Sequence, residues 1–582
     1  MKTSNIKNIP LNAGYEDGLS LDIAIVGAGV SGLYSAYRLM NEAAAADSST
    51  KAQIFEMSHR IGGRLLSVTL PAMDISAELG GMRYLDSQQI VTQLIENVFR
   101  DDLTHINFPM GDDSKLFVYL RKQRLIANQW VEAQSRGQKL ETRYYLNEGD
   151  IGYSADQLFN KVIYDVLMAD PDFVASPLSK KVSNPGPYTY EFQLTSEDWD
   201  HLKPKLTYCF EGPYNGIRVN DLGFWNLIKD RVSEEGYNFL AQAGGYYSNT
   251  INWNAAEAFP YMVGDFSDAS VTYKTIEGGY DLIAYALAYH YLKFQDSAIW
   301  VENKLVTISK QESGPRKYQL TFLNIQSDKS WHVYTDKVIL AMPRRSLELI
   351  DQESFFFRNN TLQAHMESVI MEPSFKIIMG FEEPWWKDEF GATSGHSVTD
   401  LPIRQCYYFG TDPSNSHSIL LASYNDMRTI TFWKALEDMH PERFEIQPTR
   451  LVGKEMMLQT IQSMRSPYLA SRIMVREVLN QLRELHGEDN PVPRPYVAWY
   501  KDWSDDPYGG GYHAWKAGYS VREVMEYMRH PVSEEDIYIC GEAYSDQQGW
   551  VEGAFCVAEK MLQKSFQLKR PVWLPEDYYL GW

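Results

Sequence analysis

The sequence predicts an α/β fold, α+β overall, with a Rossmann-like nucleotide-binding unit near its start. An apolar strand over residues 22–26 runs into Gly27-Ala-Gly29-Val-Ser-Gly32, and residues 33–40 continue as a helix. Glycines in such a turn let the backbone approach a pyrophosphate, which the helix N-terminus attracts. A second strand, residues 53–55, ends in Glu56, at a spacing typical of an acid that binds ribose hydroxyls. The alternative is a glycine turn with an unrelated acid nearby.

The next segment places two glycines between two arginines. It reads His59-Arg60-Ile-Gly62-Gly63-Arg64 and follows directly after the ribose-binding acid. Backbone N–H groups and guanidinium groups both suit a diphosphate. We therefore expect Arg60, Gly63 and Arg64 to contact the diphosphate of a nucleotide.

Later segments divide the chain into regions of different character. Residues 150–235 are helical and rich in Asp, Glu and Tyr, which predicts a separate lobe, and residues 348–520 mix strands with helices. Residues 299–306 are predicted as a strand pair leading into a strand at 337–343. An apolar strand over residues 536–540 ends in Gly541-Glu542, and a terminal helix starts near residue 549. The C-terminal region is thus expected to complete the nucleotide-binding domain.

Composition excludes several classes of protein. At 582 residues the chain is long enough for two or three domains. A net charge of -21 opposes binding to nucleic acid and to anionic membranes. The chain contains no apolar run long enough to span a membrane and no apolar signal segment at its start, so we expect a cytoplasmic protein. The four cysteines form no C-x-x-C pair and are predicted to be buried thiols, with neither a disulfide framework nor a metal site.

Five motifs together resemble the flavin amine oxidases, and specifically the L-amino-acid oxidases. They are the glycine turn with Glu56, residues 62–64, residues 78–83 (Glu-Leu-Gly-Gly-Met-Arg), residues 301–306, and Gly541-Glu542 followed by Gly549-Trp550. The resemblance implies a glutathione-reductase-like FAD-binding domain made of residues 16–95, 270–347 and 525–570. It further implies a mixed-sheet substrate-binding domain of residues 96–134, 236–269 and 348–524, and a helical domain of residues 135–235.

The same resemblance implies which residues hold FAD. The expected set is Gly27, Gly29, Val30, Ser31, Gly32, Glu56, Arg60, Gly63, Arg64, Gly80, Gly81, Met82, Arg83, Leu305, Val306, Gly541, Glu542, Gly549, Trp550 and Val551. Monoamine oxidases have a flavin-linked cysteine at a position where this chain has Gly511. The expected FAD is therefore noncovalent.

Three residues match functional positions of the L-amino-acid oxidases. Arg83 corresponds to the arginine that holds the substrate carboxylate, and a salt bridge to Glu78 is the alternative. Tyr424 resembles the second carboxylate contact, although it could be a core tyrosine. Lys376, a lone cation in an apolar strand, matches a lysine that holds a water beside flavin N5 and assists the reaction with oxygen. A strand-edge lysine reaching solvent is the alternative.

Two aromatic residues complete the expected catalytic set. Trp550 and Tyr512 resemble the walls of a cage beside the flavin, and the stretch that contains Tyr246 and Tyr261 is expected to border the pocket. The implied reaction is oxidative deamination of an L-amino acid, with O2 as oxidant, to a 2-oxo acid, ammonia and hydrogen peroxide. The alternatives are an L-amino-acid 2-monooxygenase, an amine or polyamine oxidase, and a flavin-binding protein without catalysis. The family implies a homodimer or higher homo-oligomer, and the preferred amino acid is not readable from the sequence.

Overall fold

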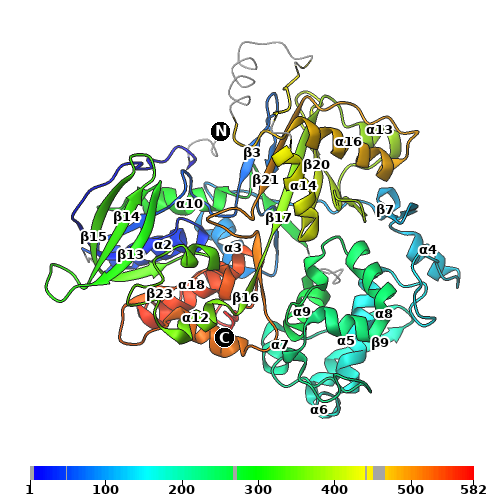
Figure 1. Cartoon of the computed structure of the whole chain (residues 1–582), viewed down its shortest axis with the longest axis horizontal. Helices are drawn as coiled ribbons and strands as arrows, with labels where there is room; N and C mark the ends of the chain where they lie inside the picture. Colours follow the sequence, from blue (N-terminus) through cyan, green and yellow to red (C-terminus); the bar gives the residue numbers. More distant parts are fainter. Residues whose placement is uncertain (1–5, 47–48, 266–271, 440–441, 448, 450–465) are drawn as a thin grey trace.

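The computed structural model describes residues 6–46, 49–265, 272–439, 442–447, 449 and 466–582. Two seven-stranded sheets form the two large parts of the molecule, and a group of helices lies beside the second sheet (Figure 1). The predicted α/β class is confirmed by this arrangement. In the described part of the chain, none of the helices has both the length and the apolar character needed to cross a membrane.

The first sheet contains the predicted nucleotide-binding strands. Its order is β12-β2-β1-β15-β14-β13, with β23 also paired to β15. Strands β12, β2, β1, β15 and β23 run parallel, whereas β13, β14 and β15 form an antiparallel meander. The strands are β1 (Leu19–Val26), β2 (Ala52–Phe55), β12 (Ile299–Trp300), β13 (Asn303–Lys310), β14 (Tyr318–Asn324), β15 (Lys329–Leu340) and β23 (Ile537–Ile539). The predicted strand pair at residues 299–306 is therefore β12 and the start of β13.

Alternation along β1 explains how this sheet is covered. Successive side chains of a strand point to opposite faces. Ile23 and Ile25 pack into one apolar cluster with the helices, whereas Ala24 and Val26 belong to another cluster that includes Trp331 of the meander. The helices on the first face are α2 (Val30–Ala45), α10 (Leu282–Tyr291) and α18 (Val551–Ser565), and α2 contacts both others. The sheet is thus buried on both faces, with a helix following directly on β1.

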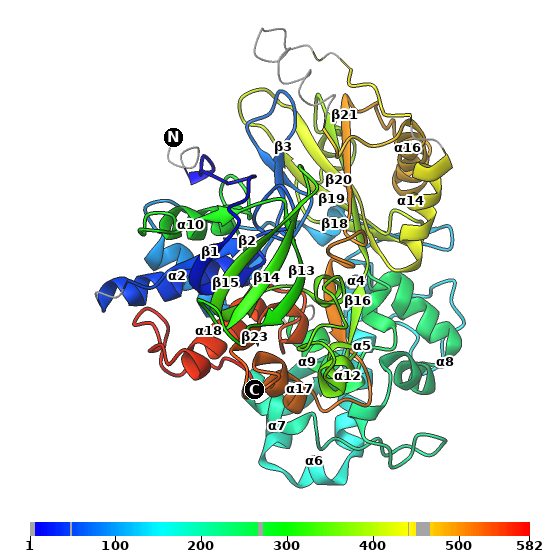
Figure 2. The same ribbon diagram turned by 60° about the vertical axis from the view of Figure 1, so that its left-hand side comes forward.

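The second sheet has the order β21-β17-β20-β19-β18-β7-β8. All its neighbours are antiparallel except β18 and β7. Its strands are β7 (Phe117–Leu120), β8 (Gln123–Ile126), β17 (Ser374–Phe381), β18 (His396–Thr399), β19 (Gln405–Thr411), β20 (Ser418–Asp426) and β21 (Val497–Asp502). Helices α14 (Arg428–Met439) and α16 (Arg472–His486) pack together beside it (Figure 2). This is the mixed sheet that the sequence predicts.

A two-stranded ribbon, β16 (Val369–Glu372) with β22 (Tyr512–Trp515), lies between the sheets and the helical region. The helical region contains α5 (Ala155–Ala169), α6 (Pro171–Ala175), α7 (Ser196–Leu202), α8 (Phe224–Ala243) and α9 (Ala255–Pro260). It also contains a hairpin, β9 (Val182–Gly186) with β10 (Thr189–Phe192), which the helical prediction missed. A hairpin this short carries little periodic signal in a sequence.

The remaining elements are short. The strands are β3 (Ser67–Thr69), β4 (Ser76–Glu78), β5 (Tyr84–Leu85), β6 (His105–Asn107) and β11 (Tyr273–Ile276). The helices are α3 (Gln89–Gln93), α4 (Gln129–Ser135), α11 (Arg344–Glu348), α12 (Asn360–Met366), α13 (Trp385–Phe390) and α17 (Val521–Arg529). Among these, the antiparallel pair β3 and β4 leads into Gly80 and Gly81.

Candidate functional site

A large cavity opens where the parallel strands of the first sheet end. Its volume is about 1180 Å³ with the open mouth included. Val26 and Phe55, the last residues of β1 and β2, line it, as do Ala341 just after β15 and Gly541 just after β23. Ligands of open α/β sheets bind at the carboxyl ends of the strands. The cavity therefore has the expected place for a nucleotide.

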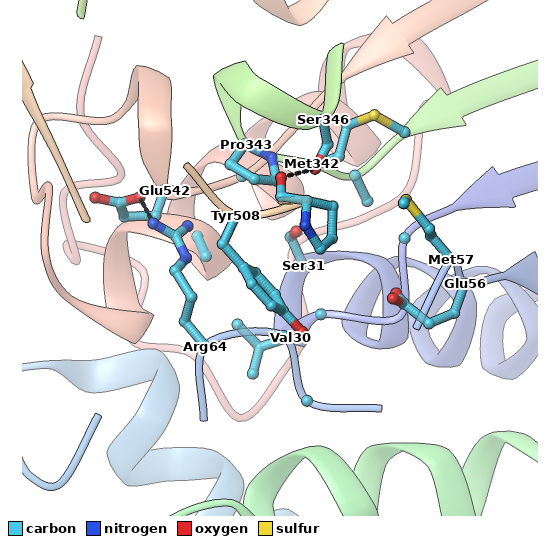
Figure 3. Close-up of a pocket in the computed structure, with 18 of the residues that line it drawn as sticks. Val30, Ser31, Glu56, Met57, Arg64, Met342, Pro343, Ser346, Tyr508 and Glu542 are labelled. Carbon is cyan, nitrogen blue, oxygen red and sulfur yellow. Dashed lines mark hydrogen bonds and ion pairs between the residues drawn. The ribbon is translucent and has the colours of Figure 1, made fainter. Parts of the chain in front are cut away.

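Predicted cofactor residues line much of this cavity. They are Gly27, Gly29, Val30, Ser31, Glu56, Gly63, Arg64, Gly81, Leu305, Gly541, Glu542, Gly549, Trp550 and Val551, together with the predicted cage residue Tyr512. Figure 3 shows Glu542 and Arg64 on one side of the cavity and Glu56 on the other, with Val30 and Ser31 at the start of α2 between them. The sequence thus predicted residues from both distant ends of the chain that meet here.

The glycine turn is required by close backbone contacts. A Cβ atom at Gly27, whose φ is +111°, would lie 2.2 Å from the carbonyl oxygen of Ala341. A Cβ atom at Gly32 would lie 2.0 Å from the carbonyl oxygen of Gly27. Helix α2 starts after Gly29 with no side-chain cap and no acid in its first turn. Its positive end therefore faces the cavity and suits a phosphate group.

Glu56 is held at the opposite side by two backbone hydrogen bonds. The N–H of Ala28 donates to Oε2 and the N–H of Ser58 donates to Oε1, both at 2.8 Å. Each carboxylate oxygen has a further lone pair. The fixed carboxylate can therefore also accept hydrogen bonds from ribose hydroxyl groups.

The two arginines near this acid have different environments. The guanidinium of Arg60 donates to the carbonyl oxygens of Ile61 and Leu65, both at 3.0 Å, and to that of Gly63. It also donates to the hydroxyl of Tyr508 at 3.1 Å. Arg60 does not line the cavity in the described structure; it supports the loop that does. In this structure the guanidinium is used by the loop, and the predicted contact of Arg60 with a diphosphate stays a prediction.

Arg64 instead lines the cavity and pairs with Glu542. Its Nη1 lies 2.8 Å from Oε2 of Glu542. Glu542 also accepts hydrogen bonds from the backbone N–H groups of His513, at 2.9 Å, and Gly549, at 2.8 Å. Burial alone would raise the pKa of Glu542, but Arg64, His513 and the Gly549 N–H hold it at about 2. The carboxylate therefore joins β22, the start of α18 and the 62–64 loop.

This pairing predicts a pH-dependent loss of stability. The pKa of Glu542 is about 2 in the folded protein against an ordinary 4.5. Glu542 thus stabilises the fold above pH 4.5, and this stabilisation is lost as the pH falls toward 2. We expect Glu542→Gln to lower the free energy of unfolding by about 3 kcal/mol at pH 7, measured by denaturant titration, and the difference from wild type to shrink on acidification.

A matched control is available at the surface. Glu526 forms an exposed pair with Arg522 at 3.5 Å, and such pairs contribute little. Glu526→Gln should leave the free energy of unfolding nearly unchanged. Equal losses in the two variants, or a loss at Glu542 that is the same at every pH, would contradict the role of the buried pair.

Lys376 lies beneath Gly80, whose neighbour Gly81 lines the cavity. It is 1% exposed, and its Nζ donates to the carbonyl oxygens of Gly80 at 2.6 Å and Glu78 at 3.3 Å. The alternative of a lysine reaching solvent is therefore wrong. Burial lowers the pKa of Lys376, with a partial opposing effect from Glu78. A Cβ atom at Gly80 would lie 2.2 Å from the carbonyl oxygen of Arg64, so this close packing requires glycine.

Arg83 is surrounded by aromatic and sulfur groups. Its guanidinium carbon lies 4.2 Å from the ring centre of Tyr273 and 5.4 Å from that of Phe108, and Nη1 lies 3.1 Å from Sδ of Met110. Glu78, the alternative partner, is instead bonded to Ser67 and to the N–H of Tyr280. Among the described residues, Arg83 forms no ion pair. An arginine stays charged in proteins, so this position favours an anionic ligand.

Tyr424 lies directly opposite Lys376 in the pairing of β17 and β20. The Nζ of Lys376 lies 4.3 Å from the ring centre of Tyr424, and the ring of Tyr246 meets that of Tyr424 edge-on at 5.0 Å. Burial raises the pKa of Tyr424 to about 12, so its hydroxyl keeps its proton at neutral pH. Tyr424 can therefore donate a hydrogen bond to an anion beside Arg83.

Tyr512 and Trp550 both line the first cavity. Gly549, the residue before Trp550, packs against the Tyr512 ring, because a Cβ atom at Gly549 would lie 3.5 Å from Cδ2 of Tyr512. Trp550 also borders a second cavity, between the helical region and the C-terminal segment, which is lined further by Trp253, Tyr261 and Trp515. The two cavities thus share Trp550.

Several predicted residues lie outside the cavity lining of the described structure. They are Gly32, Arg60, Gly80, Met82, Arg83, Val306, Lys376 and Tyr424. The side chain of Met82 packs in an apolar cluster, and the carbonyl oxygen of Val306 accepts the N–H of Asp351. Other lining residues were missed, among them Met57, Asn303, Lys304, Met342, Pro343, Ser346, Pro507 and Tyr508. Met57, Met342 and Pro343 follow strand ends, so the strand-end rule would have found them; Ser346 and Tyr508 carry no such signal.

The cysteines and possible metal ligands are separate from this site. Cys406, Cys540 and Cys556 are buried free thiols, as expected, whereas Cys209 is partly exposed. Over the described ranges, no cluster of three or more His, Cys, Asp or Glu residues is arranged to hold a metal ion.

Comparison with known proteins identifies the family and several relatives of this chain. The family model "Flavin containing amine oxidoreductase" matches residues 30–557. The chain belongs to this family of flavin-containing amine oxidoreductases. It is therefore an oxidoreductase with a flavin cofactor. Achacin from Lissachatina fulica is 25% identical, over 97% of this chain and 96% of its own length. The L-amino-acid oxidase of Mus musculus is 24% identical, over 91% of this chain and 68% of its own length.

A solved structure agrees with this assignment of the fold. A putrescine oxidase with bound putrescine superposes with a TM-score of 0.59 at 16% identity, covering 94% of this chain and all of that chain. The flavin amine oxidase fold predicted from the motifs is thereby confirmed. The site fits a flavin dinucleotide, since Gly27, Gly29, Gly63, Gly81, Gly511, Gly541 and Gly549 expose backbone along the cavity. The uncapped start of α2 supplies N–H donors midway along it.

Proposed function

We propose that this flavin oxidoreductase is an L-amino-acid oxidase that binds FAD noncovalently. The observation that carries the proposal is Arg83, a guanidinium without an ion pair among the described residues, next to the neutral phenol of Tyr424. An α-carboxylate matches this pair of donors, whereas simple amines have no anion to place there. The names of several relatives, including L-amino-acid oxidases from Mus musculus and Siganus canaliculatus, support the same substrate class.

The proposed roles follow from the side chains. Arg83 and Tyr424 hold the carboxylate, Tyr512 and Trp550 flank the amine, and Lys376 places a positive charge under the Gly80–Gly81 backbone. Fixing the substrate at both its carboxylate and its amine leaves one orientation for the α-hydrogen. When bound, the flavin supplies the two-electron acceptor that O2 then restores. Water converts the released imino acid to the 2-oxo acid and ammonia.

Support for noncovalent binding comes from Gly511, which lines the cavity where a cysteine would be needed for a covalent link. Glu56 at one side and the glycine segments along the wall suit the adenosine and flavin parts of FAD. We also propose the division into three domains at the boundaries predicted from the sequence, which the two sheets and the helical region support. The homo-oligomer and the cytoplasmic location stay predictions.

A product analysis tests the proposed reaction. The purified holoenzyme is incubated with each standard L-amino acid, and hydrogen peroxide is measured together with the product mass. The expected products are the 2-oxo acid and one equivalent of peroxide. An amide that has lost one carbon would indicate a 2-monooxygenase, and faster turnover of decarboxylated amines would indicate an amine oxidase. No anaerobic bleaching of the flavin with any of these compounds would indicate a protein without this catalysis.

A further inference from the structure

We propose that Ser248 and Asp426 form, behind Tyr512, a proton relay that accepts the proton lost by the ammonium group of the substrate. The proposal rests on the proposed oxidation of an amino acid. A substrate that arrives as an ammonium ion must lose a proton before its Cα–H bond can break as a hydride, because the nitrogen lone pair stabilises the developing positive charge. The relay gives that proton a defined acceptor outside the cage.

Hydrogen bonds connect the relay without a gap. The hydroxyl groups of Tyr512 and Ser248 are hydrogen-bonded, and Ser248 donates to Oδ2 of Asp426. Ionised Asp426 can only accept, so the single proton of Ser248 points to it. Oγ of Ser248 then accepts the proton of Tyr512. All donors in the relay are therefore oriented from the cavity toward Asp426.

Tyr512 connects this relay to the reacting groups. Its ring lines the first cavity and contacts Gly549, next to Trp550. Ser248 and Asp426 are each 1% exposed, so water does not compete for the same protons from outside. The relay thus starts at the proposed cage and ends in the protein interior.

A second buried carboxyl shows why Asp426 is the acceptor. Glu372 lies directly opposite Tyr512 across the ribbon and is fully buried, yet neither of its carboxyl oxygens has a hydrogen-bond partner in the described structure. Asp426 instead accepts from the N–H groups of Tyr247, at 2.9 Å, and Ser248, at 2.8 Å. Burial and the neighbouring Asp426 raise the pKa of Glu372 well above its ordinary value. Glu372 is therefore the neutral acid and Asp426 the ionised one.

Charges around the pair agree with this assignment. The pKa of Asp426 is raised by burial, and the hydrogen bonds from Ser248 and Tyr247 and the positive charge of Arg404 offset this only in part. The titratable or charged groups that face the relay in the described structure are Tyr247, Tyr261, Glu372, Arg404 and Tyr424. Two cations lie against the Tyr247 ring, Arg404 at 4.1 Å and Arg428 at 4.2 Å from its centre. The positive charge of Arg404 favours the ionised form of Asp426 before the proton arrives.

The transfer balances without any change of oxidation state. One N–H bond of the ammonium breaks and its proton moves to Oη of Tyr512. The phenolic proton moves to Oγ of Ser248, and the hydroxyl proton of Ser248 moves to Oδ2 of Asp426. The amine keeps the electron pair and becomes neutral, and Asp426 becomes a carboxylic acid.

Two single variants of the holoenzyme, their double variant and one control test the relay. Ser248→Ala and Tyr512→Phe each remove one hydroxyl and keep the surrounding volume. Ser397→Ala is the matched control, because Ser397 is hydrogen-bonded at 2.8 Å to a buried tyrosine, Tyr408, elsewhere in the second sheet. The rate of anaerobic flavin reduction by the preferred amino acid is measured from pH 6 to pH 10, a range chosen to include the ionisation of free amines.

We expect both relay variants to reduce about 10²-fold more slowly than wild type near neutral pH. Their rates should recover at high pH, where the free substrate already carries a neutral amine. The double variant should be no slower than either single one, because both remove the same relay. Ser397→Ala should behave like wild type. A slow rate that does not recover at high pH, or wild-type rates and pH profiles in both variants, would overturn the relay.

A measurement without turnover gives a second readout. 2-Aminoisobutyrate has no α-hydrogen, so it can bind but cannot be oxidised. Infrared difference spectra on its binding should show a new carbonyl band of a protonated carboxyl group in wild type and in Ser397→Ala, and no such band in Ser248→Ala. Its presence in Ser248→Ala would overturn the relay. If wild type is not reduced by any amino acid, the proposed function itself fails, which distinguishes the two results.

Discussion

Replacing Arg83 with alanine should lower kcat/KM for amino acids by about 30-fold to several thousand-fold. The guanidinium is partly enclosed by Tyr273, Phe108 and Met110 and forms no ion pair with the described residues. Losing one partner of an enclosed, hydrogen-bonded charge pair costs about 2–5 kcal/mol, which corresponds to a loss of about 30-fold to several thousand-fold. The loss should appear mainly as weaker apparent binding, measured by titrating anaerobic flavin reduction with substrate.

Two comparisons separate carboxylate binding from general damage to the site. Arg83→Lys keeps the charge but loses the planar pair of donors, so its loss should be intermediate. An amine that lacks the carboxylate should react equally slowly with wild type and with Arg83→Ala. If Arg83→Ala leaves the apparent affinity for amino acids unchanged, the assignment of Arg83 is wrong.

The first sheet was predictable because its signals are local. A glycine pattern between a strand and a helix is compatible with few backbone conformations. A Cβ atom at Gly27 or Gly32 would overlap a backbone oxygen, so glycine is required at both positions. Glu56 follows β2 at the expected place and lines the cavity. Gly541 and Glu542, nearly 500 residues further on, were placed in the same cavity by the family resemblance and not by any local rule.

Contacts made by side chains from separate segments could not be read in this way. Arg60 lies in a glycine- and arginine-rich segment that predicts a diphosphate contact. In the structure its guanidinium donates hydrogen bonds to carbonyl oxygens of its own loop and to the hydroxyl of Tyr508. Tyr508 lines the cavity although no motif marks it. The same holds for Glu372, whose neutrality follows from its burial beside Asp426 and not from its neighbours in sequence. Such features depend on packing, which the order of residues does not reveal locally.

The largest effect on the reaction with oxygen is expected at Lys376. Its ammonium group lies under Gly80, at 2.6 Å from the carbonyl oxygen, and the next residue, Gly81, lines the cavity. Reduction of O2 builds up negative charge, which a fixed nearby cation stabilises. Removing one such preorganised group costs about 10²–10³-fold in rate. Lys376→Met should therefore slow reoxidation of the reduced flavin by about 10²-fold, measured by stopped-flow mixing with O2, and leave anaerobic reduction by the amino acid nearly unchanged.

The pH dependence of this step identifies the charge itself. Burial lowers the pKa of Lys376 below its ordinary 10.5, so its proton is lost at a lower pH than that of an exposed lysine. Reoxidation by wild type should slow as the pH rises through this lowered pKa, and Lys376→Met should show no such slope. Lys434→Met, which removes a surface lysine paired with Asp502 and Asp505, should retain it. Lys376→Met leaves the carbonyl oxygens of Gly80 and Glu78 without this donor, so the melting temperature of the variant is measured as well. If the melting temperature is unchanged, the slower reoxidation results from the missing charge. Equal reoxidation rates in Lys376→Met and wild type would show that the cation has no part in the reaction with oxygen.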